Sequence, residues 1–299
     1  MVLESLIGPK KAERSPWDVF FIGMLYASLA MFLSVWIFRE QASIIMVLLT
    51  VIACLPLMHK TLILEEKKDK RIEKEIPLLK EHWKALQFFM YLFLGFVAAF
   101  SIWYVFLPDD MVKTTFNSQI ETINAINSRV TGHTGQTISS ANIADASGSA
   151  ASLGNIFVQI LTNNLKVLLF CVFFAFFYGA GSIFILAWNA SVISAAIGTF
   201  IRNNFGEYAA TVGLTKVGGY FHIFSLGFAR YFIHGIPEIL AYFIGALAGG
   251  IISVAVVRHD FGTEKFKRIL IDSVDLIVLA FFALFVAALM EVYITPAFF

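Results

Sequence analysis

The fold of this chain is decided by residues 220–257, which read YFHIFSLGFARYFIHGIPEILAYFIGALAGGIISVAVV. A bilayer core of about 30 Å is crossed by roughly 20 apolar residues in a helix, because backbone groups without water must bond inside their own segment. The stretch is therefore predicted to be helical and to lie in a membrane. It is too long for one straight span, and its middle, His234 to Glu238, is predicted to interrupt it.

The composition supports membrane residence. Of 299 residues, 59% are hydrophobic and 14% are charged, whereas soluble domains average about 45–50% apolar and about 25% charged residues. The net charge is +1 and there is no basic stripe, so nucleic acid is not expected as a partner. Cys54 and Cys171 lie inside apolar runs, which argues against a disulfide scaffold.

Further apolar stretches predict an all-α, polytopic transmembrane bundle of about six to seven spans, with broken or re-entrant helices in its C-terminal half. Gly179 and Gly181 divide one long stretch into two spans. In the stretch quoted above, Gly235 and Pro237 mark the break, because proline removes a backbone donor. The predicted spans cover 19–38, 42–58, 86–107, two segments within 165–201, part of 220–257, and 269–295.

The basic residues predict the orientation. Segments 1–18, 59–85 and 258–268 together hold 15 of the 22 Lys and Arg residues. These segments fall on one side if the spans alternate, and an excess of Lys and Arg in short loops marks the cytoplasmic side. The chain is therefore expected in the cell membrane as a multi-pass protein with a cytoplasmic N-terminus.

Three parts are predicted along the chain. Residues 1–107 form a three-span module with a charged cytoplasmic loop at 59–85, interpreted as a solvated juxtamembrane helix. Residues 108–155 form an external amphipathic helix and a Gly/Ser/Ala-rich tether, and residues 156–299 form a transmembrane core. The external helix has a narrow apolar face that is expected to lie on lipid or on another protein and to support a homodimer. Its residues are Phe116, Ile120, Ile123, Ile126 and Val130.

Several polar residues inside the predicted core are candidates for function. His234 and Glu238 are four residues apart and would share one face of a helix. A metal pair, a proton or ion site and a substrate contact are all open, but a buried pair that satisfies a broken helix is favoured, because zinc needs further ligands. Asp272 and Asp275 could bind a cation, although the helix dipole also favours acids there. Asn189 could bond across helices.

Small residues also point to close helix packing. Gly245 and Gly249 form a pair of the kind that lets helix backbones approach, and packing inside the chain is favoured over a dimer seam. Glu291, near the end of the last span, is interpreted as lying at headgroup level. No phosphate-binding loop, nucleophile elbow or zinc signature is present. No catalytic residue, metal or cofactor is therefore predicted.

Four features of the C-terminal half resemble the stage II sporulation protein M family over about residues 156–296. They are Asn163, Asn164, Leu165 and Lys166 at the start of a span, Gly179 and Gly181 at a turn, Asn189 in the next span, and His234 to Glu238 before a Gly/Ala-rich helix. The chain departs from the family pattern at Ala190, where glycine is common, and at Ile233, where proline is common. The resemblance implies a membrane protein that, in sporulating bacteria, works with partners that remodel the cell wall during engulfment.

Three functions are compared. The expected one is a non-enzymatic membrane scaffold that organises partner proteins of the membrane or envelope, or shapes the membrane, with the bilayer and a second copy as partners. The alternative is a transporter or channel that uses the intramembrane His, Glu and Asp residues, although no inverted repeat of hydropathy is evident. An intramembrane metalloenzyme at His234 and Glu238 is the third, and it lacks further ligands.

Overall fold

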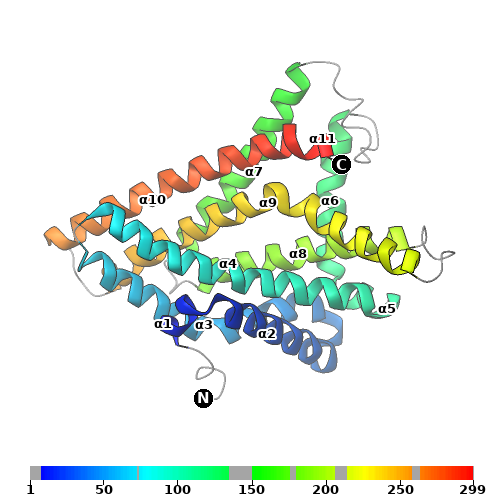
Figure 1. Cartoon of the computed structure of the whole chain (residues 1–299), viewed down its shortest axis with the longest axis horizontal. Helices are drawn as coiled ribbons and strands as arrows, with labels where there is room; N and C mark the ends of the chain where they lie inside the picture. The colour runs from blue at the N-terminus through cyan, green and yellow to red at the C-terminus, as the bar shows by residue number, and fades with distance from the viewer. Residues whose placement is uncertain are drawn as a thin grey trace.

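The structure is a computed structural model that describes residues 8–72, 74–134, 150–175, 180–205, 214–257 and 263–298. In these ranges it contains helices and no strand (Figure 1). Seven helices are long and apolar enough to cross a membrane, which confirms the predicted all-α polytopic bundle. They are α2 (Pro16–Ile37), α3 (Ala42–Asp69), α4 (Glu75–Phe106), α7 (Ala150–Ala175), α8 (Ala180–Asn204), α9 (Leu214–Val257) and α10 (Glu264–Leu289).

Shorter elements connect these spans. The three residues between the predicted spans 19–38 and 42–58 form the 3₁₀ turn η2, which closes a hairpin. At the C-terminal end, α10 runs directly into a π-helical turn. The short elements are α1 (Pro9–Arg14), η2 (Arg39–Gln41), α5 (Asp109–Thr115), α6 (Asn117–Thr134), the π-helical turn η4 (Met290–Ile294) and α11 (Thr295–Phe298).

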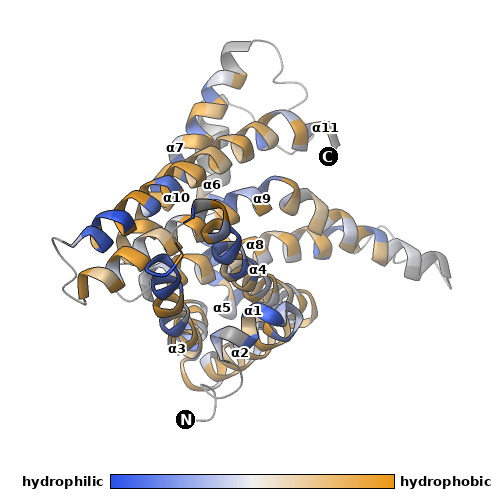
Figure 2. Cartoon of the chain, turned by 60° about the vertical axis from the view of Figure 1, so that its left-hand side comes forward, coloured by the Kyte–Doolittle hydropathy of each residue, from blue (hydrophilic) through white to orange (hydrophobic). Residues whose placement is uncertain are grey.

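Apolar residues cover the long helices, and hydrophilic residues gather at the ends of α3 and α10 (Figure 2). Inside the bundle, α4 packs against α2, α8 and α9. The Phe89 and Phe243 rings are stacked with centroids 5.5 Å apart, which joins α4 to α9. A Cβ atom on Gly95 would lie 2.3 Å from the Phe20 carbonyl oxygen, so α2 and α4 cross at backbone distance.

Arg202 fixes the end of α4 against α8. Its guanidinium donates to the carbonyl oxygens of Tyr104 at 2.8 Å and Leu107 at 3.0 Å, and it also pairs with Asp109. The last carbonyls of a helix have no partner within the helix, so this side chain caps α4. Close by, the hydroxyls of Tyr104 and Thr199 lie 2.8 Å apart. These contacts fix the position of α4 along α8.

The charged segment 59–85 differs from the predicted solvated helix. Its two halves are the continuations of α3 and α4, because α3 ends at Asp69 and α4 begins at Glu75. Glu65, Asp69 and His82 in this segment are no more than 2% exposed. Charged residues of this segment are therefore buried where α3 packs against α4.

The outer amphipathic helix also differs from the prediction. Phe116 is fully buried, and Ile120 and Ile123 pack against the core. Gln119, also fully buried, donates to the carbonyl oxygen of Ser43 and to the Ser191 hydroxyl, both at 3.1 Å. This apolar face is covered by the chain's own spans, so it is not a free surface for lipid or a second copy. The side chains of Ile126 and Val130 lie outside the described residues, as do residues 135–149 of the tether predicted over 131–154.

Helix α9 is continuous where a break was predicted. It extends over 44 residues, or about 66 Å, and Pro237 lies inside it. The helix changes direction here and does not end (Figure 1). A helix can lose one backbone hydrogen bond at proline and continue. One half of α9, Tyr231–Val257, is long and apolar enough to cross a membrane. Residues 214–230 extend α9 beyond this segment.

The glycine pair on α9 lies against α7. A Cβ atom on Gly249 would lie 2.4 Å from the Val172 carbonyl oxygen, and one on Gly245 would lie 2.4 Å from Leu168 Cδ1. Gly181, at the start of α8, faces Phe174 in the same way. Gly179 lies outside the described residues. The α7–α9 contact is thus a backbone-to-backbone approach that a side chain at Gly249 would block.

We predict that Gly249→Ala destabilises the purified protein by about 1–3 kcal/mol, because the backbone carbonyl of Val172 cannot move aside as a side chain would. Gly235→Ala on the same helix is the matched control, since its Cβ meets no atom within 4 Å. The measurement is thermal unfolding in detergent. Equal melting temperatures for the two variants would contradict the close α7–α9 approach.

Candidate functional site

Glu238 is bonded within its own helix. The Tyr242 hydroxyl, one turn later on α9, donates to Glu238 Oε1 at 2.7 Å. Tyr242 is fully buried, and it is among the largest buried side chains of the described residues. A buried tyrosine hydroxyl needs a partner, and the carboxyl group is that partner. The contact places a carboxyl group inside the span Tyr231–Val257.

Two further helices contribute to this site. Asn164 on α7 is 6% exposed, and its side chain lies close to the Glu238 carboxyl group. The Asn164 amide nitrogen does not form a hydrogen bond of regular geometry. Glu291 in η4 lies close enough to Glu238 for their charges to interact. We call Asn164, Glu238, Tyr242 and Glu291 the membrane carboxyl cluster. Asn164 and Glu238, which both carry the family resemblance, thus meet in space.

His234 contacts α11, directly after η4. Its Nδ1 atom lies 3.1 Å from Thr295 Oγ1, and Thr295 Oγ1 donates to the Met290 carbonyl oxygen at 3.2 Å. A π-helical turn frees backbone groups from the regular helix pattern, and such turns are frequent at functional sites. His234 therefore connects α9 to this turn and does not pair with Glu238.

The chemistry open to the cluster follows from its two carboxyl groups. A charge inside a bilayer costs about 2.5–3.5 kcal/mol on insertion scales, so such groups face partners or a wet cavity. Two neighbouring carboxyl groups can share a proton or bind a cation together. In the part of the chain that the structure describes, no group of three or more His, Cys, Asp or Glu side chains is arranged to hold a metal ion.

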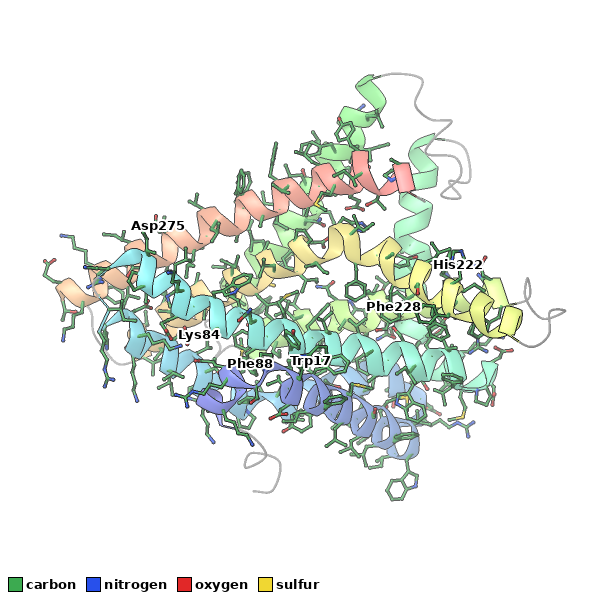
Figure 3. All side chains as sticks on the ribbon, viewed as in Figure 1. Trp17, Lys84, Phe88, His222, Phe228 and Asp275 are labelled. Carbon is green, nitrogen blue, oxygen red and sulfur yellow. The ribbon has the colours of Figure 1, made fainter. Side chains whose placement is uncertain are left out.

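The remaining predicted site residues lie elsewhere. Asp272 precedes Glu291 by nineteen residues, about 28 Å along a helix. Asp275 is exposed on α10 (Figure 3). Asn189 is half-buried on α8 and makes no side-chain hydrogen bond to another described residue. The predicted polar core is thus divided between two ends of the bundle and α8.

Asp272 belongs to a second site that the sequence prediction missed. On α4, His82 Nδ1 lies 2.8 Å from Glu65 Oε2, and His82 Nε2 lies 3.0 Å from Asp69 Oδ1. Both ring nitrogens can donate to carboxylates only in the imidazolium form. Asp272 and Arg268 on α10 lie near enough to interact with this group, and Arg268 Nε lies 3.8 Å from Asp272 Oδ2.

Lys68 extends this group to α1. Its Nζ atom lies 2.7 Å from Glu65, 3.1 Å from Glu13 and 3.5 Å from Glu81. Burial raises the pKa of the Glu13 carboxyl group, and the Lys68 charge opposes that rise. The inner charge network, as we name it, therefore joins α1, α3, α4 and α10. Its members are Glu13, Glu65, Lys68, Asp69, Glu81, His82, Arg268 and Asp272.

The only trace of this network in the sequence is the spacing of Glu65, Lys68 and Asp69, which lie three and four residues apart on one helix face. Nothing local assigns His82 to them, because the pairing depends on how α3 packs against α4. Solvated surface helices show the same spacing, so the signal is weak without the fold.

We predict that His82→Ala lowers stability by about 3–5 kcal/mol, because Glu65 and Asp69 would remain buried without their shared cation. His222→Ala removes an exposed histidine (Figure 3) and is the control. Adding Glu65→Gln and Asp69→Asn to His82→Ala should recover part of the loss. The readout is the monodisperse fraction and the melting temperature in detergent; equal losses for His82→Ala and His222→Ala would refute the network.

The fold and the buried polar sites define a multi-span α-helical membrane protein. The family model for stage II sporulation protein M matches residues 85–296. The match covers more than half of the chain, so the chain belongs to the stage II sporulation protein M family, as the sequence resemblance predicted. It begins earlier than residue 156, near the start of α4, and takes in the whole membrane carboxyl cluster. No curated protein and no solved structure matches.

Proposed function

We propose that the protein is a non-enzymatic membrane scaffold, whose helical core organises partner proteins or shapes the membrane. The observation that carries this proposal is that several polar side chains inside the spans make hydrogen bonds within the chain. Glu238 accepts from Tyr242, and His234 lies against Thr295. Ser194 on α8 likewise donates to the Val97 carbonyl oxygen on α4 at 3.1 Å. The last two of these contacts each join two different helices.

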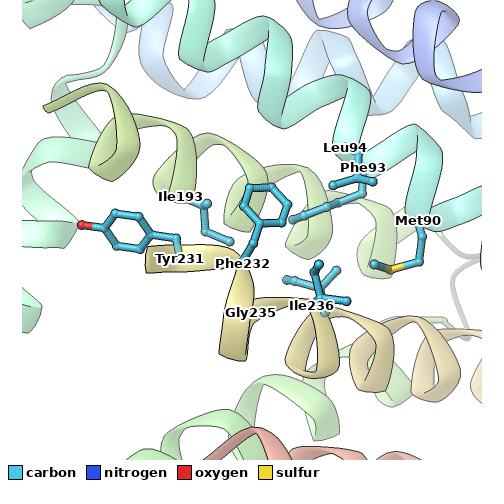
Figure 4. A pocket seen from close by; sticks show the side chains of 9 residues that line it. Met90, Phe93, Leu94, Ile193, Tyr231, Phe232, Gly235 and Ile236 are labelled. Atoms are coloured by element: carbon cyan, nitrogen blue, oxygen red, sulfur yellow. The ribbon is translucent and has the colours of Figure 1, made fainter. Parts of the chain in front are cut away.

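A hollow beside α9 supports the same proposal. It lies at the change of direction of α9, where Phe232 and Ile236 face Met90 and Phe93 of α4 and Ile193 of α8 (Figure 4). Its lining is apolar and includes no member of the membrane carboxyl cluster. An apolar hollow of this kind offers no polar path for an ion.

Partners of a scaffold need accessible surfaces, and α2 and α10 are among the spans that have them. On α2, Phe21 is 62% exposed and Trp36 is 82% exposed. On α10, Val278 and Phe282 are 62% and 63% exposed. Lipid covers such faces in a single copy, and close packing of small and apolar residues lets other helices replace that lipid. A second copy of the chain or a membrane protein of the envelope would pack on these faces.

A transporter or channel is the second candidate function. The observation in its favour is the carboxyl pair Glu238 and Glu291, one of which lies on a π-helical turn. Irregular helices with acidic residues near them are where transporters bind ions.

We predict that proteoliposomes containing the protein show no proton or cation flux above that of empty liposomes. Glu238→Gln and Glu291→Gln should leave this result unchanged, with the exposed Glu264→Gln as the control. The double variant His234→Ala, Glu238→Ala should instead lower the melting temperature, because contacts to Thr295 and Tyr242 are lost. Selective flux that Glu238→Gln abolishes and Glu264→Gln preserves would establish transport and overturn the scaffold.

The proposed orientation has a cytoplasmic N-terminus in the cell membrane, with seven crossings. Both native cysteines are buried, so an added cysteine can report the side. We predict that a membrane-impermeant maleimide labels Lys113→Cys on α5 in intact cells, and labels Lys11→Cys on α1 only after permeabilisation. Both lysines are exposed. Labelling of Lys11→Cys in intact cells would reverse the orientation.

A further inference from the structure

A groove between α1 and α3 carries charges that neither the scaffold nor the transport reading uses. Gly8, Pro9 and Lys11 line it from α1, and Lys60, Ile63, Leu64 and Lys67 line it from α3. It lies just past the predicted span 42–58, where the apolar run of α3 ends. Side chains at this level of a membrane protein meet lipid headgroups.

The α3 side of the groove has a regular pattern. Lys60, Ile63, Leu64 and Lys67 are spaced three and four residues apart, which places them on one face of the helix. Two cations therefore flank two apolar side chains, and Lys11 adds a third cation from α1. A long lysine side chain can lay its carbon chain on an apolar surface and hold its ammonium group at the headgroups.

The three groove lysines have no acidic partner among the described residues. Among the described residues, none of Lys11, Lys60 and Lys67 forms an ion pair. The neighbouring Lys68 turns instead to Glu13, Glu65 and Glu81 in the inner charge network. Glu13, Glu65 and Glu81 are thus paired with Lys68, and the lysines of the groove keep their positive charge.

We propose that this groove binds the phosphate headgroup of an anionic phospholipid, with the acyl chains along the exposed apolar surface of α3. Three unpaired ammonium groups match a phosphate, and basic residues next to a span attract anionic lipid. The apolar side chains Ile63 and Leu64 between the cations fit a lipid and add nothing for a free phosphate ion. Ile52, eight residues before Lys60, is 53% exposed, so α3 offers a lipid-facing surface leading up to the groove.

The test is native mass spectrometry of the full chain in a neutral detergent, titrated with dioleoyl phosphatidylglycerol or with dioleoyl phosphatidylcholine. The groove variant carries Lys11→Gln, Lys60→Gln and Lys67→Gln. The matched control carries Lys80→Gln, Lys265→Gln and Lys267→Gln, which removes the same charge from exposed lysines elsewhere on the same side.

Wild type and control should bind phosphatidylglycerol in preference to phosphatidylcholine, and the groove variant should bind it on the order of a hundredfold more weakly. Lys60→Gln alone should weaken binding by about fivefold, which keeps the test valid if the triple variant misfolds. Equal binding by groove variant and control would overturn the site. Equal affinity for phosphatidylcholine, or displacement by millimolar inorganic phosphate, would overturn its assignment to an anionic lipid.

Discussion

The structure depends on one constraint: a polar group inside a bilayer must find its partner within the protein, because lipid offers none. The contact between Tyr242 and Glu238 is the clearest case. It lies where α7, α9 and η4 meet. Asn164 on α7 and Glu291 in η4 both lie close enough to the Glu238 carboxyl group to interact with it. Helices that share a buried polar group cannot separate without exposing it to lipid, so the cluster holds the C-terminal half together.

A second set of polar contacts performs the same task at the other end of the bundle. The inner charge network joins α1, α3 and the first turns of α4, which precede the part matched by the family model, to α10 inside that part. Buried ion pairs add little net stability when complete, but removing one partner is costly. The network therefore fixes how the first spans sit on the family core. Beside it lies the groove that Lys11, Lys60 and Lys67 line.

Much of the fold could be predicted from the sequence, because the length of an apolar run is a local property. The hairpin at Arg39–Gln41 and the division of 165–201 into two helices follow from it. Partner choice is not local. The sequence predicts Glu291 at the level of the lipid headgroups. In the structure, its charge lies close enough to interact with that of Glu238, which is far away along the chain. His82 sits among alternating charges typical of a solvated helix, and only the packing of α3 on α4 buries it. Pro237 bends α9 without ending it.

If the membrane carboxyl cluster only holds helices together, it is closed to water, and the reactivity of the Cys171 thiol measures whether water reaches it. Its thiol is fully buried and lies close to Tyr242. In a Cys54→Ala background, a water-soluble methanethiosulfonate reagent should leave Cys171 unmodified in the folded protein and modify it only after denaturation. Mass spectrometry of the intact chain counts the adduct. Modification of folded protein at the rate of an exposed thiol would show a hydrated path to the cluster and would contradict the account.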